Sequence, residues 1–254
     1  MKAVSPRNSN ERILTVLDSY LNKNDYVSAE EHLLCCMEKA KENADTGALF
    51  LVYNELMGLC RKLGREDDAL SYVSLTLELI KREGLDGSVG AATAYLNCAT
   101  VYKAFSRPEE SIRLFERARG IYERELERGD ERLGGLYNNM ALTLVDLGRF
   151  GEANELYERA LTVARGTEKG MLSAAMTYLN LANAAESELG LCDADKKIQT
   201  YLERAREMLD GHTRRDGYYA FVCEKCASVF LYYGHFAYAS ELKLRSEKIY
   251  NGGQ

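Results

Sequence analysis

Cysteine and histidine are the residues in this sequence whose spacing most readily suggests chemistry. Cys223 and Cys226 are separated by two residues, and His32, Cys35 and Cys36 follow the i, i+3, i+4 spacing of one helix face. A zinc ribbon would need a second pair of ligands, and a thiol redox motif would need a preceding strand. Neither feature accompanies these residues. We therefore interpret Cys36, Cys223 and Cys226 as small buried hydrophobic side chains and predict no metal site.

Catalytic residues are not recognisable either. His212 and His235 fall near predicted loops or turns without a paired carboxylate or a nucleophile motif. The acidic residues form no identifiable acid and base pair, and the glycines suit turns and not a phosphate-binding loop. We expect a protein that is not an enzyme and that uses no cofactor.

Asparagine is the polar residue whose placement most strongly suggests binding. Asn97, Asn139 and Asn180 recur 42 and 41 residues apart. A side-chain amide can donate to a peptide carbonyl and accept from a peptide N–H group, so a ladder of amides suits an extended peptide. The alternative is that these amides are only solvated, or that they bind the neighbouring repeat. The predicted peptide-binding residues share one side of the predicted helices: Asn97, Asn138, Asn139, Asn180, Asn183, Thr100, Lys62, Lys103, Asp146 and Lys225.

Composition narrows the class of protein. With a formal net charge of -6, the chain lacks the clustered basic surface that nucleic-acid phosphates require. Seven cysteines, an odd number without framework spacing, fit a reducing compartment. No apolar run approaches the length of a membrane span, and the first residues lack the apolar stretch of a signal peptide. We expect a cytoplasmic protein whose partners are neither nucleic acid nor membrane.

The elements that must position these residues are internal repeats. The segment from Tyr137 to Ala160 recurs upstream from Tyr95 to Ala118 at the same offsets, a further copy starts at Tyr178, and weaker copies fit toward both ends. Six repeats follow one another at about residues 9–46, 47–87, 88–129, 130–167, 168–212 and 213–250. They predict a single domain over residues 9–250, with a disordered lead at residues 1–8 and a disordered tail at residues 251–254.

Each repeat is predicted to form two helices. Small and apolar residues recur at i, i+3, i+4 and i+7, as from Tyr137 to Leu144, and alanines such as Ala141 and Ala160 allow two helices to cross closely. Residues 190–195 look like an insertion in the turn of the fifth repeat. In four repeats the middle turn carries a residue that accepts the left-handed conformation: Asn24, Gly64, Gly148 and Gly234.

These repeats resemble the tetratricopeptide repeat. Its order of aromatic, Leu, small, aromatic, Gly, Ala, aromatic and Ala residues is matched from Tyr137 to Ala160, except at Leu144, where an aromatic residue is usual. The period of about 42 residues and the Asn-x-Ala element are similar to the subgroup found in kinesin light chains. The resemblance implies an all-α fold, a right-handed α-solenoid superhelix of about six helix-turn-helix repeats and about twelve helices. In kinesin light chains such asparagines bind a peptide main chain, and this implication extends only to Asn97, Asn139 and Asn180.

The repeats and the asparagine ladder together predict a non-catalytic scaffold or adaptor that binds a peptide segment of a partner protein in a concave groove. Two alternatives stay open. The last repeat is unusually aromatic, from Tyr218 to Tyr250, so the chain is alternatively a structural protein that forms a homo-oligomer through this repeat. The second alternative is a cytosolic sensor of a small signalling peptide, as in bacterial regulators built from similar repeats.

Overall fold

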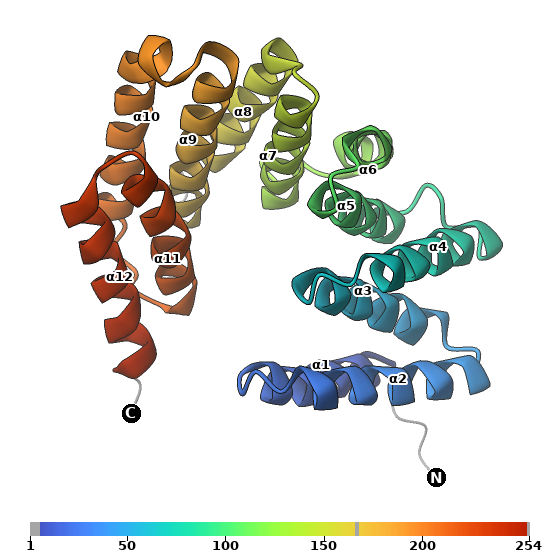
Figure 1. Ribbon diagram of the computed structural model, residues 1–254. Coiled ribbons are helices and arrows are strands. Elements are labelled where there is room, and N and C mark those ends of the chain that lie inside the picture. The colour runs from blue at the N-terminus through green and yellow to red at the C-terminus, as the bar shows by residue number, and fades with distance from the viewer. Residues whose placement is uncertain (1–5, 166–167, 253–254) are drawn as a thin grey trace. The chain divides into compact units, whose positions relative to one another are not determined.

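The structure, a computed structural model, describes residues 6–165 and 168–252, and every regular element in these ranges is an α-helix (Figure 1). Each predicted repeat contains one pair of successive helices, which confirms the all-α class and the helix-turn-helix repeats. The helices are α1 (Pro6–Leu21), α2 (Tyr26–Glu42), α3 (Thr46–Lys62), α4 (Glu66–Arg82), α5 (Val89–Ala104), α6 (Pro108–Glu125), α7 (Glu131–Asp146), α8 (Phe150–Ala164), α9 (Glu168–Leu189), α10 (Leu191–Gly211), α11 (Gly217–Tyr232) and α12 (Phe236–Asn251).

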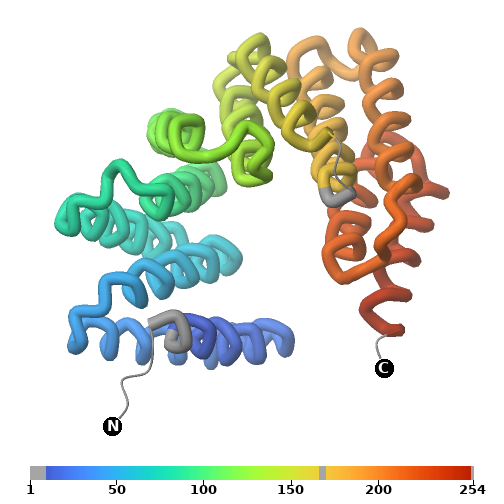
Figure 2. Tube along the Cα trace, turned by 180° about the vertical axis from the view of Figure 1, so that it is seen from behind, coloured from blue at the N-terminus to red at the C-terminus, as the bar shows by residue number. Residues whose placement is uncertain are grey.

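The helices are grouped in two compact units, Met1–Glu125 and Leu126–Gln254. The first unit holds α1 to α6 and the second holds α7 to α12, and Figure 2 shows the three helix pairs of each from behind. The single domain expected over residues 9–250 stays a prediction. Of the predicted lead and tail, residues 6–8 belong to α1 and Asn251 ends α12, while residues 1–5 and 253–254 lie outside the described residues. None of the helices in the described ranges is both long and apolar enough to span a membrane.

Alanines at the helix crossings explain the close packing of each repeat. A larger side chain at such a crossing would overpack it, at a cost of about 1 to 3 kcal/mol. Aromatic rings fill the adjacent space, and Tyr95, Phe115 and Tyr157 are each no more than 1% exposed. The alanines assigned to crossings are no more than 3% exposed: Ala69, Ala99, Ala118, Ala141, Ala153, Ala160, Ala182, Ala205 and Ala239.

The middle turn of every repeat contains one residue with left-handed backbone. The φ angles are 56° at Asn24, 71° at Gly64, 57° at Ser106, 70° at Gly148, 80° at Gly190 and 80° at Gly234. The four predicted positions are confirmed, and Ser106 and Gly190 complete the set. This conformation lets the next amide close the helix end, as where the Arg149 nitrogen donates to the Leu144 carbonyl at 2.8 Å.

The fifth repeat differs from its prediction. The expected insertion at residues 190–195 is wrong, because the turn is Gly190 and α10 begins at Leu191. The extra residues lengthen the helices, since α9 has 22 residues and α10 has 21, against 16 for α7 and 15 for α8. Ala194, Ile198 and Leu202 continue one helical stripe and are no more than 1% exposed, so burial of this stripe extends the helix where the sequence suggests a loop.

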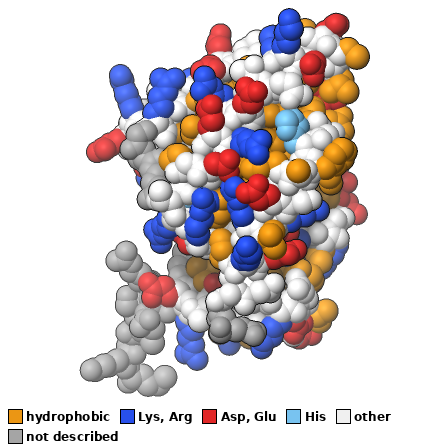
Figure 3. All heavy atoms as spheres, turned by 90° about the vertical axis from the view of Figure 1, so that its left-hand side faces the viewer, with side chains coloured by type: hydrophobic (Ala, Val, Ile, Leu, Met, Phe, Trp, Pro, Cys, Tyr) orange, Lys and Arg blue, Asp and Glu red, His pale blue; other side chains and the backbone are white. Residues whose placement is uncertain are grey.

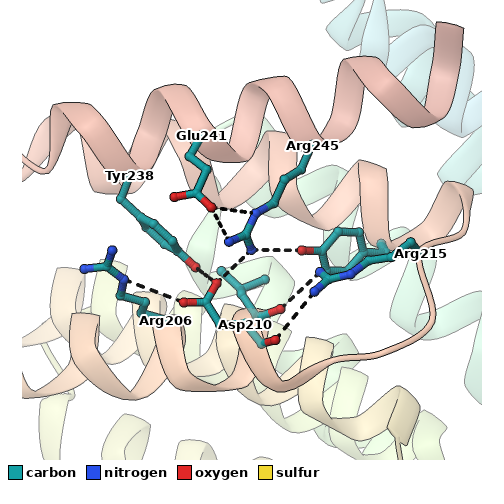
Figure 4. A network of polar contacts seen from close by, with 8 residues as sticks. Arg206, Asp210, Arg215, Tyr238, Glu241 and Arg245 are labelled. Atoms are coloured by element: carbon teal, nitrogen blue, oxygen red, sulfur yellow. Dashed lines mark hydrogen bonds and ion pairs between the residues drawn. The ribbon is translucent and has the colours of Figure 1, made fainter. Parts of the chain in front are cut away.

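A polar network attaches the last repeat to the fifth (Figure 4). Asp210, near the end of α10, accepts a hydrogen bond from the Tyr238 hydroxyl at 2.9 Å and pairs with the Arg245 guanidinium at 2.7 Å, both from α12. Arg215, in the connection to α11, donates to the Leu209 carbonyl at 3.4 Å. These contacts hold α11 and α12 in place, and α11 packs against α9.

Candidate functional site

All ten residues predicted to bind a peptide lie on the first helices of the repeats. Within the first unit α1, α3 and α5 pack successively, and within the second unit α7, α9 and α11 do. The side of each set that the second helices leave open is termed the first-helix face. The first unit contributes Lys62, Asn97, Thr100 and Lys103, and the second contributes Asn138, Asn139, Asp146, Asn180, Asn183 and Lys225.

Two of the three ladder asparagines bind an asparagine of the preceding repeat. The Asn97 amide nitrogen donates to the side-chain oxygen of Asn54 on α3. In the same way, Asn180 donates to Asn138 on α7 at 3.1 Å. The described residues supply no other hydrogen bond to the side chains of Asn97 and Asn180. Each of these amides therefore keeps its oxygen and one N–H group for a ligand.

Asn139, the third member of the ladder, is different. It lies on α7, the first helix of the second unit. Within the described ranges the half-buried Asn139 side chain makes no hydrogen bond. Its whole amide is thus available on the first-helix face of the second unit.

Other predicted residues already have partners. The Thr100 hydroxyl donates to a backbone carbonyl one helical turn earlier at 2.9 Å. The Lys62 ammonium lies 4.7 Å from the centre of the Tyr26 ring, and the Lys225 ammonium lies 5.6 Å from the centre of the Phe221 ring. Two further predicted charges also take part in polar or electrostatic interactions: Lys103 and Asp146.

The first unit has an apolar pocket of about 400 Å³ between α3 and α5. Phe50, Leu51 and Leu85 form much of its wall, and Asn54 and Asn97 lie at its edge. The volume falls within the range of small-ligand pockets, which typically combine apolar walls with a few polar groups. This pocket can accept an apolar side chain while the amide pair contacts the main chain that carries it.

A row of polar groups continues from this pocket toward α1. Asn97 donates to Asn54, and the Asn54 amide makes a long contact of 3.4 Å with the Glu55 carboxylate. Burial raises the pKa of the Glu55 carboxyl; the Asn54 contact opposes this shift and the negative charge of Asp18 on α1 adds to it. No lysine or arginine of the described chain pairs with Glu55 or Asp18. The row therefore ends in two carboxylates without a cation.

The second unit has a pocket of about 540 Å³ between α9 and α11, with a more polar lining. Glu186 lies in its wall and accepts hydrogen bonds from the Tyr232 hydroxyl at 2.7 Å and the Tyr233 hydroxyl at 2.8 Å. Tyr233 also lies 3.0 Å from the Asn183 oxygen. Burial, followed by the hydrogen bond to Glu186, raises the pKa of the Tyr233 phenol. Both oxygens of this carboxylate are thus already bound within the unit.

The sequence analysis missed Asn54, Glu55 and Phe50. A signal for Glu55 was present, because it occupies the position in the second repeat that Asn97 occupies in the third. Asn54 carries a weaker signal, as the counterpart of Asn138 in the Asn-Asn element. Phe50 becomes recognisable only when α3 and α5 are placed side by side.

The histidine and cysteine residues with suggestive spacing are either buried or in contact with neighbouring protein groups. The His32 ring nitrogen lies 3.1 Å from the Ile13 carbonyl and 3.8 Å from the Cys36 sulfur. Cys223 and Cys226 are buried, and burial raises the pKa of their thiols to about 11 and about 12. No three His, Cys, Asp or Glu side chains of the described residues are placed as a metal would require.

Comparisons with known proteins agree with this architecture. Two sequence models of the tetratricopeptide repeat family match, one over residues 48–124 and the other over residues 134–167. No curated protein sequence matches the chain. The chain is a tetratricopeptide repeat protein.

Solved structures show the same fold at low sequence identity. The crystal structure of BtubC (BKLC) from P. vanneervenii has a TM-score of 0.70 at 22% identity, over 83% of this chain and 85% of that one. A putative kinesin light chain of nearly identical repeats from Podosopora anserina has a TM-score of 0.52 at 15% sequence identity, over 80% of this chain and 95% of that one. NprR from B. thuringiensis, in complex with its cognate peptide NprX, has a TM-score of 0.59 at 19% sequence identity, over 94% of this chain and 66% of that one. The kinesin light chain similarity agrees with the resemblance seen in the repeats.

Proposed function

We propose that this protein is a non-catalytic, cytoplasmic scaffold that binds a peptide segment of a partner protein on its first-helix faces. The observation that carries the proposal is that each unit places a pocket between two first helices, close to amides that retain hydrogen-bonding capacity. Such a combination suits an extended peptide, because the pocket accepts a side chain and the amides contact the main chain. The seven unpaired cysteines support the cytoplasmic part of the proposal.

Hydrogen bonds alone would give only weak binding. Each amide contact is worth about 0.5 to 1.5 kcal/mol net, whereas a micromolar complex needs about 8 kcal/mol. The ladder amides of each unit therefore set the register of the peptide bound to that unit, and the pockets supply most of the remaining free energy by burying side chains.

The test is a selection from a displayed library of random 12-residue peptides against the full chain, followed by calorimetric titration of synthetic copies of the selected peptides. Asn139→Ala is the cleanest variant, because the side chain has no hydrogen-bond partner among the described residues. We expect it to weaken the peptides that bind the second unit by about fivefold, the loss of one net hydrogen bond.

The matched control is Glu203→Ala, at an exposed position of the second helix α10. It removes a polar side chain outside the first-helix face and should leave affinity unchanged. A library that yields no binder contradicts the proposal, as do selected peptides whose affinity is insensitive to Asn97→Ala, Asn139→Ala and Asn180→Ala together.

The exposed aromatic side chains of the last repeat favour self-association as a second candidate. Phe236 is 66% exposed and Tyr250 is 55% exposed, both on α12. Figure 3 shows the side of the molecule on the left of Figure 1, where hydrophobic side chains lie among charges of both signs. Light scattering distinguishes the candidates, because Phe236→Ser with Tyr250→Ser would convert an oligomer to a monomer and would not change the mass of a monomeric scaffold. Tyr232 is less suited to this test because it binds Glu186.

A sensor of a small signalling peptide would be a special case of the scaffold. Its support is the fold shared with NprR, which was solved with its cognate peptide. This alternative stays a prediction.

A further inference from the structure

The apolar pocket of the first unit and the carboxylates beside it define the chemistry of a ligand. We propose that the first unit binds a peptide segment in which an apolar side chain lies close to a lysine or arginine. The apolar side chain occupies the pocket between α3 and α5, and the cation lies against Glu55 and Asp18. This inference rests on the proposed function and adds the chemical class of the bound segment.

The pocket sets the apolar half of this requirement. Its wall is formed by Phe50, Leu51, Leu85 and the nearly buried Ala91 and Ala94. Its polar groups stand at the edge, where Asn54 and Asn97 bind each other. A charged side chain placed inside would lose its hydration without gaining a counter-ion.

Charge complementarity sets the basic half. Glu55 is half-buried on α3, directly after the pocket residue Asn54, and Asp18 lies near enough on α1 for its charge to act on the Glu55 carboxyl. Both carboxylates lack a cationic partner in the described chain. A lysine or arginine from a partner would relieve their repulsion and meet the unused acceptor capacity of Glu55.

The amides of Asn97 and Asn54 connect the pocket to the carboxylates, and their length indicates how far the apolar side chain of the ligand lies from its cation. Asn54 contacts Asn97 at the pocket edge and Glu55 on the other side. The pocket and the carboxylates are thus separated by about two or three residues of an extended peptide, at about 3.3 Å per residue.

The second unit does not present the same requirement. Its carboxylate, Glu186, already accepts two tyrosine hydroxyls, and its pocket lining includes Ser187 and Ser228. Of the carboxylates described at the two pockets, Glu55 therefore has the larger unused capacity to accept hydrogen bonds, and a second acid, Asp18, acts on it.

The experiment uses the full chain and the displayed library of random 12-residue peptides. Peptides that bind the first unit are identified by their loss of binding to the variant Gly90→Leu. An added Cβ at this pocket residue would meet only the Ser88 hydroxyl, at 3.8 Å. The larger side chain narrows the pocket without a clash at its Cβ. The control is Gly120→Leu on α6, where an added Cβ meets nothing within 4 Å.

We expect peptides lost with Gly90→Leu to carry Lys or Arg within about three residues of an apolar residue. For synthetic copies, Glu55→Gln and Asp18→Asn should each weaken binding by about threefold to fivefold and reduce its salt dependence. Glu78→Gln, an identical charge change at an exposed position of α4, should leave affinity unchanged. Glu55→Lys should restore binding to a peptide in which the basic residue is replaced by Glu.

The outcomes separate the two proposals. Peptides that require the pocket but are acidic or uncharged, or that bind Glu55→Gln with Asp18→Asn as well as wild type, overturn this inference and leave the proposed function intact. Selected peptides that are all insensitive to Gly90→Leu also overturn it. A library that yields no binder overturns both.

Discussion

The two units have the same amide pair on their first-helix faces but differ in how a carboxylate on each face is bound. Asn54 and Asn97 in the first unit correspond to Asn138 and Asn180 in the second. In the first unit the neighbouring Glu55 has one long amide contact of 3.4 Å. In the second unit, by contrast, the carboxylate accepts two tyrosine hydroxyls at 2.7 and 2.8 Å.

This difference shows which features follow the repeat and which do not. The amide pairs follow the repeat because the same two positions, offset by one residue, meet in both units where adjacent first helices pack together. The environment of a carboxylate depends on residues from other helices. Glu186 accepts hydrogen bonds from the α11 residue Tyr232 and from Tyr233, which directly follows this helix, whereas the neighbour of Glu55 on α1 is a second acid.

The largest predicted effect on stability concerns the aspartate that accepts a hydrogen bond from a buried tyrosine hydroxyl in each unit. Asp210→Ala in the second unit removes the acceptor of the buried Tyr238 hydroxyl and one of the carboxylates paired with Arg245. The Asp210 side chain is itself 42% exposed, so water replaces part of these contacts, and we expect the free energy of unfolding to fall by about 1 to 2 kcal/mol. Urea denaturation measures the loss, and hydrogen exchange should locate it in α10 to α12.

The matched variant in the first unit is Asp86→Ala. Asp86 accepts from the Tyr95 hydroxyl and pairs with Arg117 at 2.5 Å, but its side chain is 58% exposed. Water can replace much of what is lost, so we expect a decrease below about 1 kcal/mol. Equal effects of the two variants would show that the network around Asp210 adds nothing beyond an exposed ion pair.

An intermediate effect is expected from exchanging two turn residues. Ser106 in the first unit and Gly148 in the second have φ angles of 57° and 70°. Gly148→Ser should lower the free energy of unfolding by about 1 kcal/mol, because side chains with a Cβ are strained in the left-handed region. An added Cβ at Gly148 meets nothing within 4 Å, so backbone strain is the only cost expected. Thermal unfolding should show the opposite sign for Ser106→Gly, and a shared sign would refute this explanation.

The smallest predicted effects, and the most direct test of the comparison, come from replacing one glutamate by glutamine on each first-helix face. Glu186→Gln should lower the free energy of unfolding by at most about 1 kcal/mol, because the partly buried Tyr233 hydroxyl loses a charged acceptor. Glu55→Gln should instead raise it by less than about 1 kcal/mol, because it removes a partly buried charge without a counter-ion.

The pH dependence gives the sign of the Glu55 effect independently. Its folded-state pKa is raised by burial, so the charged carboxylate costs stability above that pKa, and the cost disappears as the pH falls through it. The gain from Glu55→Gln should therefore be present at pH 7 and vanish under acidic conditions in urea titrations. A gain that persists in acid would mean that Glu55 acts through packing and not through charge.

The sequence predicted the packing best where a residue type has a single structural role, as alanine has at a close helix crossing. Alanines such as Ala99 and Ala182 were assigned to helix crossings and are fully buried. The fifth repeat was less predictable, because residues 190–195 were interpreted as an insertion in the turn, whereas α10 begins at Leu191. The burial of Ala194 decides for the helix.

The helices that carry the ladder asparagines were predictable, but the contacts of these side chains were not. Asn97 and Asn180 lie on the first helices as expected, yet each donates to an asparagine of the preceding repeat. The one-residue offset of these pairs, from Asn97 to Asn54 and not to its counterpart Glu55, depends on the rotation and tilt of neighbouring helices. Hydrophobic periodicity indicates which side of a helix is buried, but it does not specify this rotation closely enough.

The sequence by itself determined that this protein is a series of paired helices with alanine at the crossings, because these properties depend on residues close together in one repeat. Only the tertiary structure decided which amides retain free hydrogen-bonding groups, where the pockets form, and which carboxylates lack partners. Each of these depends on side chains that are about 40 residues apart in the chain and meet only when two first helices pack together.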